Sequence, residues 1–194
     1  PEVNLEDYTL NRLIANPNCS TIQAVLPLKA LQEAFGIQRV NYSTYQAVSG
    51  SGQKGIEDLH RTQNDEEPVL YPYNISQTVI PEIDQPLENG YTKEEQKMIN
   101  ETRKILHQPA LPVSATCVPV PIENGHGVSV AVQLQKEFTT EEIRECLSQF
   151  PGIQLEDDLA AHKYPTSILA RGTDMVYVGR IRKDTSLENG LLFY

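Results

Sequence analysis

Several features that define common classes of protein are scarce in this sequence. Its 16 lysine and arginine residues are outnumbered by 26 aspartates and glutamates, which gives a formal net charge of −10. This balance argues against nucleic-acid binding, because a protein that contacts the phosphate backbone needs a basic face. No apolar run approaches the ~20 residues that span a bilayer, so we expect no membrane association.

Cysteine is also scarce, and its pattern argues against two further classes. Cys19, Cys117 and Cys146 are an odd number of cysteines at scattered spacings, which is a poor disulfide framework and is typical of a reducing, cytoplasmic setting. No pair of histidines or cysteines has the spacing of metal ligands, so we expect no metal site. The sequence lacks an initiator methionine and a signal peptide, and it opens as if cut from a longer protein.

The pattern of helices and strands in the sequence predicts an α+β domain. The mixed order of strands and long helices indicates a mixed, largely antiparallel sheet with helices on one face. Capping boxes, with threonine first and glutamate three residues later, open two of the helices at Thr92–Glu95 and Thr139–Glu142. The predicted helices cover 20–35, 54–61, 92–106 and 139–150, and the predicted strands cover 39–48, 113–122, 127–134 and 174–182.

The first predicted helix carries the most informative cysteine. Ser20 and Thr21 can cap this helix and Gly36 can end it, while Pro27 implies a kink or a shortened first segment. Cys19 therefore lies between an Asn-Pro-Asn turn and a helix N-terminus, where free N–H groups stabilise a thiolate and a developing oxyanion. The position predicts a nucleophile, and the alternative is a small buried hydrophobic residue. Cys117 and Cys146 lie on apolar faces and are predicted to pack in the core.

Two other groups of residues have both a functional and a structural interpretation. His126, between two glycines at the entrance of a strand, can serve as an acid or base near neutral pH, or it is a surface turn histidine. Glu94 and Lys97 are three residues apart on one helix face, where they form either a solvated ion pair or a pair that faces a substrate. The G-x-G-x-x-G segment 50–55 matches a dinucleotide fingerprint, but no second βαβ unit follows it. We interpret it as a flexible loop near the site.

Taken together, these segments resemble bacterial aspartate-semialdehyde dehydrogenases almost from end to end. The resemblance is carried by "NPNCST" (16–21), "STYQAVSGSG" (43–52), "NGYTKEEQKMINETRKIL" (89–106), "ATCV" (115–118), "GH" (125–126) and the segment from "GRIRKD" to "ENGL" (179–191). It implies the C-terminal domain fold of glyceraldehyde-3-phosphate dehydrogenase. It also implies the reductive dephosphorylation of β-aspartyl phosphate by NADPH through a cysteine thioester, in the biosynthesis of the aspartate family of amino acids.

The resemblance also implies a role for each candidate residue. Cys19 would be the nucleophile with Asn18 beside it, Gln46 would orient the intermediate, and His126 would be the acid and base. Two residues of the second long helix would bind the substrate: Glu94 its amine and Lys97 its phosphate. A homodimer that binds a small acyl phosphate or aldehyde is implied, and NADP is the implied cofactor.

Three departures from the family pattern qualify this interpretation. Residues 1–194 would be the catalytic and dimerisation domain, without the nucleotide-binding domain and the final helix of the family. Pro119 stands where the family has an arginine for the substrate carboxylate, and proline cannot replace a guanidinium. Gly127 and Val128 stand where a serine and an acid usually follow the histidine. We therefore expect little or no turnover by these residues alone, and the alternatives are a non-catalytic dimerisation or binding module and a regulatory thiol protein.

Overall fold

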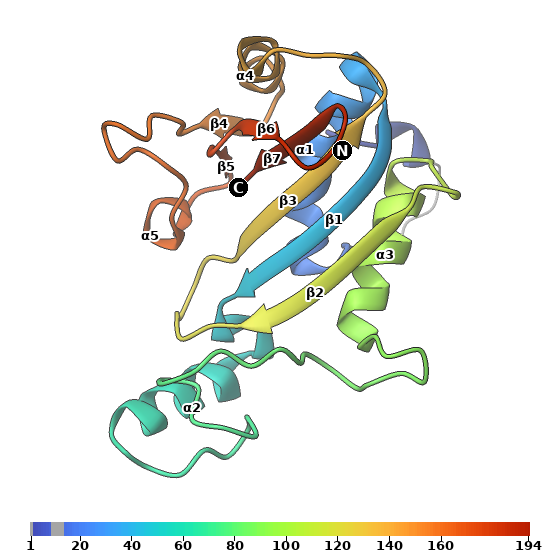
Figure 1. Cartoon of the computed structure of the whole chain (residues 1–194). Coiled ribbons are helices and arrows are strands. Elements are labelled where there is room, and N and C mark those ends of the chain that lie inside the picture. The colour runs from blue at the N-terminus through green and yellow to red at the C-terminus, as the bar shows by residue number, and fades with distance from the viewer. Residues whose placement is uncertain (1, 9–13) are drawn as a thin grey trace.

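A computed structural model describes residues 2–8 and 14–194 and shows one mixed sheet with helices packed on one face (Figure 1). Strands follow one another across this sheet in the order β2-β1-β3-β7-β6, and β4 and β5 form a separate pair. The helices are η1 (Leu5–Asp7), α1 (Cys19–Phe35), η2 (Val48–Ser51), α2 (Gln53–Gln63), α3 (Lys93–Ile105), α4 (Thr140–Ser148) and α5 (Ser167–Ala170). The strands are β1 (Ile37–Gln46), β2 (Val113–Pro119), β3 (Gly127–Leu134), β4 (Ile153–Leu155), β5 (Val176–Val178), β6 (Arg182–Asp184) and β7 (Gly190–Phe193).

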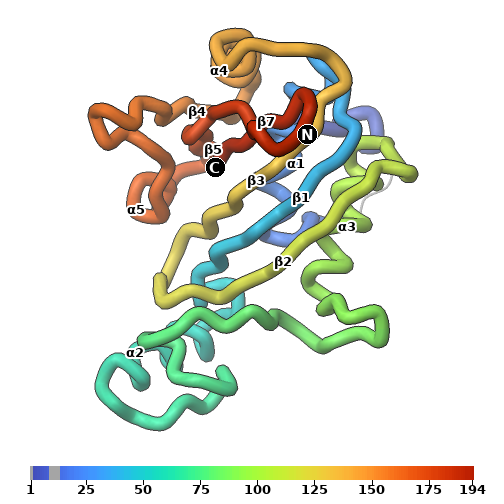
Figure 2. Tube along the Cα trace, viewed as in Figure 1, coloured from blue at the N-terminus to red at the C-terminus, as the bar shows by residue number. Residues whose placement is uncertain are grey.

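The main sheet confirms the predicted α+β class. β1 pairs in parallel with β2, whereas the β1–β3, β3–β7 and β7–β6 pairs are antiparallel. Alternate residues of β3 are buried, which is the period of a strand with one face on the core. α1 and α3 pack on that face, and in Figure 2 the opposite face of β1, β2 and β3 carries no helix of the described chain.

α1 starts at Cys19, two residues earlier than a cap at Ser20 would allow. Asn18 is the N-cap, and its Oδ1 accepts hydrogen bonds from the N–H groups of Ser20 and Thr21. Both residues lie inside the first turn, so the expectation that they cap the helix is wrong. The helix also runs unbroken through buried Pro27, and Gly36 ends it with φ +72° as predicted.

The C-terminal third differs most from the predicted elements. The strand predicted over 174–182 is two strands, because Arg180 adopts the left-handed conformation with φ +57° between them. β5 pairs with β4 away from the main sheet, and β6 joins the main sheet beside β7. β4 and β7 were not predicted as strands. Both capping boxes are present at the predicted threonines.

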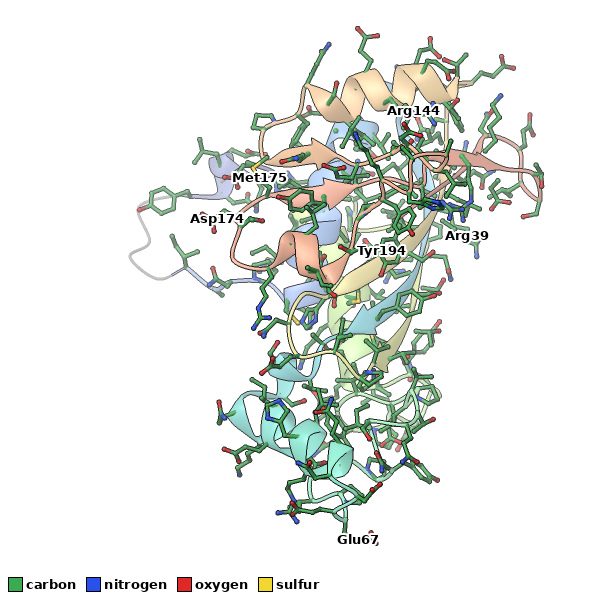
Figure 3. The ribbon with its side chains drawn as sticks, turned by 90° about the vertical axis from the view of Figure 1, so that its left-hand side faces the viewer. Arg39, Glu67, Arg144, Asp174, Met175 and Tyr194 are labelled. Atoms are coloured by element: carbon green, nitrogen blue, oxygen red, sulfur yellow. The ribbon has the colours of Figure 1, made fainter. Side chains whose placement is uncertain are left out.

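Residues 48–80 form a small subdomain beyond one end of the sheet. α2 packs mainly on η2, and a separate apolar cluster of Val48, Leu59, Ile75 and Ile80 holds the segment together. Figure 3 shows this subdomain, with Glu67 near its tip, at the opposite end of the molecule from Arg144 of α4. One edge of the subdomain faces the ends of β1 and β2, so it can form a wall of a site there.

Asp58 organises the loop of this subdomain. Asp58 is 1% exposed, and its carboxylate accepts hydrogen bonds from the backbone N–H groups of Val69, Leu70 and Tyr71 at 2.7, 3.0 and 3.0 Å. Burial acts to raise the pKa of Asp58, but the three donors together outweigh it and the pKa lies below its ordinary value. The carboxylate is therefore held charged, and it fixes residues 69–71.

The Asp58→Ala variant should unfold more easily by about 1–3 kcal/mol at neutral pH, because three loop donors lose their acceptor. A lowered pKa in the folded state contributes stability above the unfolded pKa, and that contribution disappears as the pH falls through the folded value. The difference in urea stability between wild type and variant should therefore shrink in acid. Glu57→Ala, which removes an exposed neighbouring carboxylate, is the control; equal losses in both variants would contradict this role.

Candidate active site

One cavity of about 410 Å³ collects most of the predicted site residues. It lies where the N-terminal ends of α1 and α3 meet the C-terminal ends of β1 and β2, and the subdomain closes one side. Cys19, Gln46, Glu94, Lys97 and Pro119 all line it. The remaining lining residues are Ala47, Gly50, Ser51, Leu70, Tyr71, Pro72, Glu82, Ile83 and Asp84. The 50–55 segment was predicted to be a flexible loop near these residues. Gly50 and Ser51 do line the cavity, but the loop prediction is wrong, because the segment forms the end of η2 and the start of α2.

Cys19 is the first residue of α1 and is exposed to solvent. It is therefore not a buried hydrophobic residue, which was the alternative interpretation. Cys117 is fully buried, and Cys146 packs against the core with its Sγ 3.6 Å from the carbonyl oxygen of Ala30. Both confirm the predicted core positions. Among these cysteines, only Cys19 is exposed.

The charge state of Cys19 differs from the expectation. Burial of the sulfur by surrounding protein atoms and the negative charge of Glu94 raise the pKa of Cys19, and the hydrogen bonds from Ser20 only partly offset them. Cys19 is exposed to solvent, yet the protein atoms around its sulfur and the carboxylate of Glu94 disfavour its thiolate. The structure therefore disfavours the ionised sulfur expected at this helix N-terminus, because desolvation and the neighbouring carboxylate outweigh the N–H groups of Cys19 and Ser20.

Glu94 connects the elements that meet at the cavity. Its Oε1 accepts hydrogen bonds from Asn18 Nδ2 at 2.6 Å and from Gln46 Nε2 at 3.3 Å. Gln46 also donates to Ser20 Oγ at 2.6 Å. Glu94 is only 7% exposed, so its charge acts across the cavity with little screening. This carboxylate therefore fixes two amide side chains beside Cys19 and supplies a buried negative charge.

Lys97 is paired with acids on both sides. Its Nζ lies 2.9 Å from Asp84 Oδ2 and 3.6 Å from Glu94 Oε2, and the hydrogen bond to Asp84 is the main cause of its raised pKa. Glu94 and Lys97 thus form the ion pair that the structural interpretation predicted. Both also line the cavity, where the functional interpretation needs them to face a substrate. Asp84 was not identified from the sequence, because it lies in an irregular loop and carries no motif.

His126 lies beside the cavity and is not a free surface histidine. Its Nδ1 accepts a hydrogen bond from the N–H of Ala47 at 2.8 Å, and a Cβ placed on Gly50 would be 3.3 Å from its Cε1. Burial lowers the pKa of His126, so the ring is neutral near pH 7 with its proton on Nε2. In this tautomer Nε2 is a proton donor and cannot accept a proton.

A second, smaller cavity of about 150 Å³ lies on the other side of His126. It lies between α1, β3 and the α5–β5 region, and Gln23 and Tyr194 line it together with His126. The Tyr194 hydroxyl occupies the space that a Cβ at Gly127 would need. This contact accounts for the glycine that follows His126 in place of the usual serine.

Neutralising Glu94 should make Cys19 more reactive. In Glu94→Gln the negative charge that raises the pKa of Cys19 is lost while an oxygen remains to accept from Asn18, so alkylation near pH 7 should accelerate several-fold. Iodoacetamide rates, read on the Cys19 peptide by mass spectrometry, measure this. Glu82→Gln removes an exposed carboxylate from the same cavity and is the control; a slower or unchanged rate in Glu94→Gln would contradict the electrostatic account.

Within residues 2–8 and 14–194, no group of three or more His, Cys, Asp or Glu side chains could hold a metal ion. No helix in the same ranges is both long and apolar enough to cross a membrane.

Comparison with known proteins gives consistent results. A family model described as "Semialdehyde dehydrogenase, dimerisation domain" matches residues 28–194. The chain is 48% identical over 201 residues to an aspartate-semialdehyde dehydrogenase of Aquifex aeolicus, covering 98% of this chain and 59% of that protein. The 194 residues thus span about 59% of that relative's length.

Solved structures are similar over all or most of this chain. Aspartate semialdehyde dehydrogenase II of Vibrio cholerae, complexed with ASA, has a TM-score of 0.92 at 40% identity and covers 100% of this chain and 60% of its own. Aspartate semialdehyde dehydrogenase of Candida albicans, with NADP, has a TM-score of 0.67 at 25% identity and covers 93% of this chain and 51% of its own.

Proposed function

Since the chain belongs to the semialdehyde dehydrogenase family, we propose that residues 1–194 are the catalytic and dimerisation domain of an aspartate-semialdehyde dehydrogenase. One observation supports this most strongly: an exposed cysteine at a helix N-terminus shares a cavity with Gln46, Glu94 and Lys97. The proposed setting is the cytoplasm, and the proposed substrate is β-aspartyl phosphate.

The chemistry proposed for these residues is acyl transfer to Cys19. The thiolate attacks the acyl carbon of β-aspartyl phosphate, the carbon–oxygen bond to phosphate breaks, and inorganic phosphate leaves with the bonding electrons. A thioester on Cys19 remains. Such covalent catalysis divides one difficult step into two easier ones. His126, with its proton on Nε2, is proposed as the acid that supplies a proton to a developing oxyanion.

We propose that side chains of α3 and the amides beside it bind the substrate. Glu94 would bind the substrate ammonium, which also cancels the charge that raises the pKa of Cys19. Lys97 would bind the phosphate after exchanging Asp84 for it. Gln46, held by Ser20 and Glu94, would orient the thioester, and Asn18 would hold the start of α1. Substrate binding would thus favour the thiolate that the chain by itself disfavours.

NADP is the proposed cofactor, but the described residues do not fit a dinucleotide site. The G-x-G-x-x-G segment 50–55 folds into η2 and the start of α2, and α2 packs mainly on η2 rather than on the sheet. It therefore lacks the βαβ packing that seats a pyrophosphate. We derive no hydride step from these residues. We propose that NADP binds to a region equivalent to the part of the relatives that these 194 residues do not span. The 194 residues alone should accordingly form no NADPH.

A homodimer is the proposed assembly. Within residues 2–8 and 14–194, no helix covers the face of β1, β2 and β3 opposite α1 and α3 (Figure 1). This face carries the partly exposed Ser43, Ser129 and Ala131 and Tyr45, which is 42% exposed. An exposed sheet face of this kind suits packing against a second copy. We propose it as the dimer surface of the domain.

A non-catalytic binding or dimerisation module is the second candidate. The observations that favour it are the raised pKa of Cys19 and the neutral Pro119 at the cavity wall. In that case the fold and the dimer surface would remain while the cysteine does not acylate.

Release of phosphate in a single turnover separates the two candidates. The chain is mixed with β-aspartyl phosphate without nucleotide, and inorganic phosphate is measured against time. The enzyme domain should release about one phosphate per chain in a burst, since acylation precedes the hydride step. Release no faster than spontaneous hydrolysis would overturn the acyl-transfer proposal and support the module.

A further inference from the structure

The residue before the nucleophile is held by two carboxylates of one helix. The backbone N–H of Asn18 donates to Glu101 Oε2 at 2.7 Å, and Asn18 Nδ2 donates to Glu94 Oε1 at 2.6 Å. Glu94 and Glu101 are seven residues apart on α3, which is two helical turns and places them on the same face. The backbone N–H and the side-chain amide of Asn18 therefore both donate to carboxylates of α3.

The acceptors of Asn18 are also engaged, all within α1. Its Oδ1 accepts from the N–H groups of Ser20 and Thr21, and its carbonyl oxygen accepts from the N–H of Ile22 at 2.9 Å. The direction in which Asn18 points thus sets the first turn of α1, and with it the position of the Cys19 thiol. A capping side chain of this kind contributes about 1 kcal/mol to its helix.

Glu94 and Glu101 differ in what else they contact. Glu94 lines the cavity, and its Oε1 is shared by Asn18 and Gln46. Glu101 is not one of the residues that line the cavity, and it contacts Asn18 through the backbone. When a cation at Glu94 weakens the hydrogen bond of Asn18 Nδ2, the bond to Glu101 can keep the backbone of Asn18 in place.

We propose that Glu101 is a positioning residue that holds Cys19 in its reactive place by binding the backbone N–H of Asn18. The proposal rests on the proposed function only in taking Cys19 as the nucleophile. It separates two tasks on α3: Glu94 faces the ligand, and Glu101 anchors the helix start that carries the thiol.

Two variants separate anchoring from charge. Glu101→Gln removes the charge but keeps an oxygen that can accept from Asn18, whereas Glu101→Ala removes both. If Glu101 acted only through its charge, both variants would alkylate faster, since a nearby anion disfavours the thiolate. If it anchors Asn18, Glu101→Ala should alkylate several-fold more slowly at pH 7, because the N–H groups that favour the thiolate lose their alignment, while Glu101→Gln should match or exceed wild type.

The measurement is the iodoacetamide rate of Cys19, read on its own peptide so that Cys117 and Cys146 do not contribute. Glu145→Ala, which removes an exposed carboxylate from α4, is the control and should leave the rate unchanged. Equal rates in wild type and Glu101→Ala, or faster rates in both Glu101 variants, would overturn the proposal. If Glu101→Ala does not fold, hydrogen exchange in the wild type decides: the amide of Asn18 must be protected, and free exchange there would overturn it.

The outcome for Glu101 is independent of the outcome for the proposed function. A phosphate burst in the wild type together with unchanged alkylation in Glu101→Ala would leave the enzyme proposal standing and remove the anchor. Slower alkylation in Glu101→Ala without any burst in the wild type would leave the anchor standing and remove the acyl transfer.

Discussion

The Cys19→Ser variant should release phosphate from β-aspartyl phosphate at least about 10³-fold more slowly than wild type in the single-turnover assay. A serine hydroxyl is far less acidic than a thiol, so it needs a base to become a nucleophile. His126 cannot be that base in the neutral tautomer that the Ala47 hydrogen bond requires, because Nδ1 accepts from Ala47 and Nε2 then carries the proton. A cysteine needs less help, since part of it ionises without a base.

The other two cysteines provide the matched control for this variant. Cys146→Ser changes a thiol packed against the core, and it should keep the phosphate burst of the wild type. Cys117 is less suitable because it is fully buried and burial raises its pKa to about 12. If Cys19→Ser kept the burst, or if Cys146→Ser lost it in a folded protein, Cys19 would not be the acylated residue.

The sequence predicted the parts of this protein that depend on local chemistry. The capping boxes at Thr92 and Thr139 are present because each needs only residues within one helical turn. The start of a helix at Cys19 is equally local, although the cap is Asn18 and not the two hydroxyl residues that follow. The fold class followed from the order of such elements.

The parts that the sequence did not predict depend on distant contacts. β7 is only Gly190–Phe193, and its pairing with β3 makes it a strand. The break at Arg180 requires a left-handed conformation that a residue other than glycine seldom adopts. The pKa of Cys19 is raised partly by Glu94, which comes from another helix. The position at a helix N-terminus alone predicted a lowered pKa for Cys19. The sequence could not show the actual direction, because the fold decides which charges surround a thiol.

The Pro119→Arg variant should gain affinity for a ligand that carries a carboxylate. Pro119 ends β2 and lines the cavity, where three carboxylates, those of Glu82, Asp84 and Glu94, face the single ammonium of Lys97. The resemblance to the family implies an arginine at this position. A guanidinium that pairs with a carboxylate contributes roughly 1.5–3 kcal/mol, which corresponds to about 10- to 100-fold in binding.

A matched pair of ligands isolates this effect. L-2-aminobutyrate and propylamine differ by one carboxylate, so calorimetric titration of both gives the contribution of that group directly. The ratio of their affinities should shift toward aminobutyrate by about 10- to 100-fold in Pro119→Arg. Val118→Arg is the control, because neighbouring residues of a strand point to opposite faces and the new charge would lie outside the cavity. An unchanged affinity ratio in a folded Pro119→Arg protein would contradict this prediction. It would mean that the carboxylates of the cavity neutralise the arginine, and that position 119 does not determine the specificity of this site.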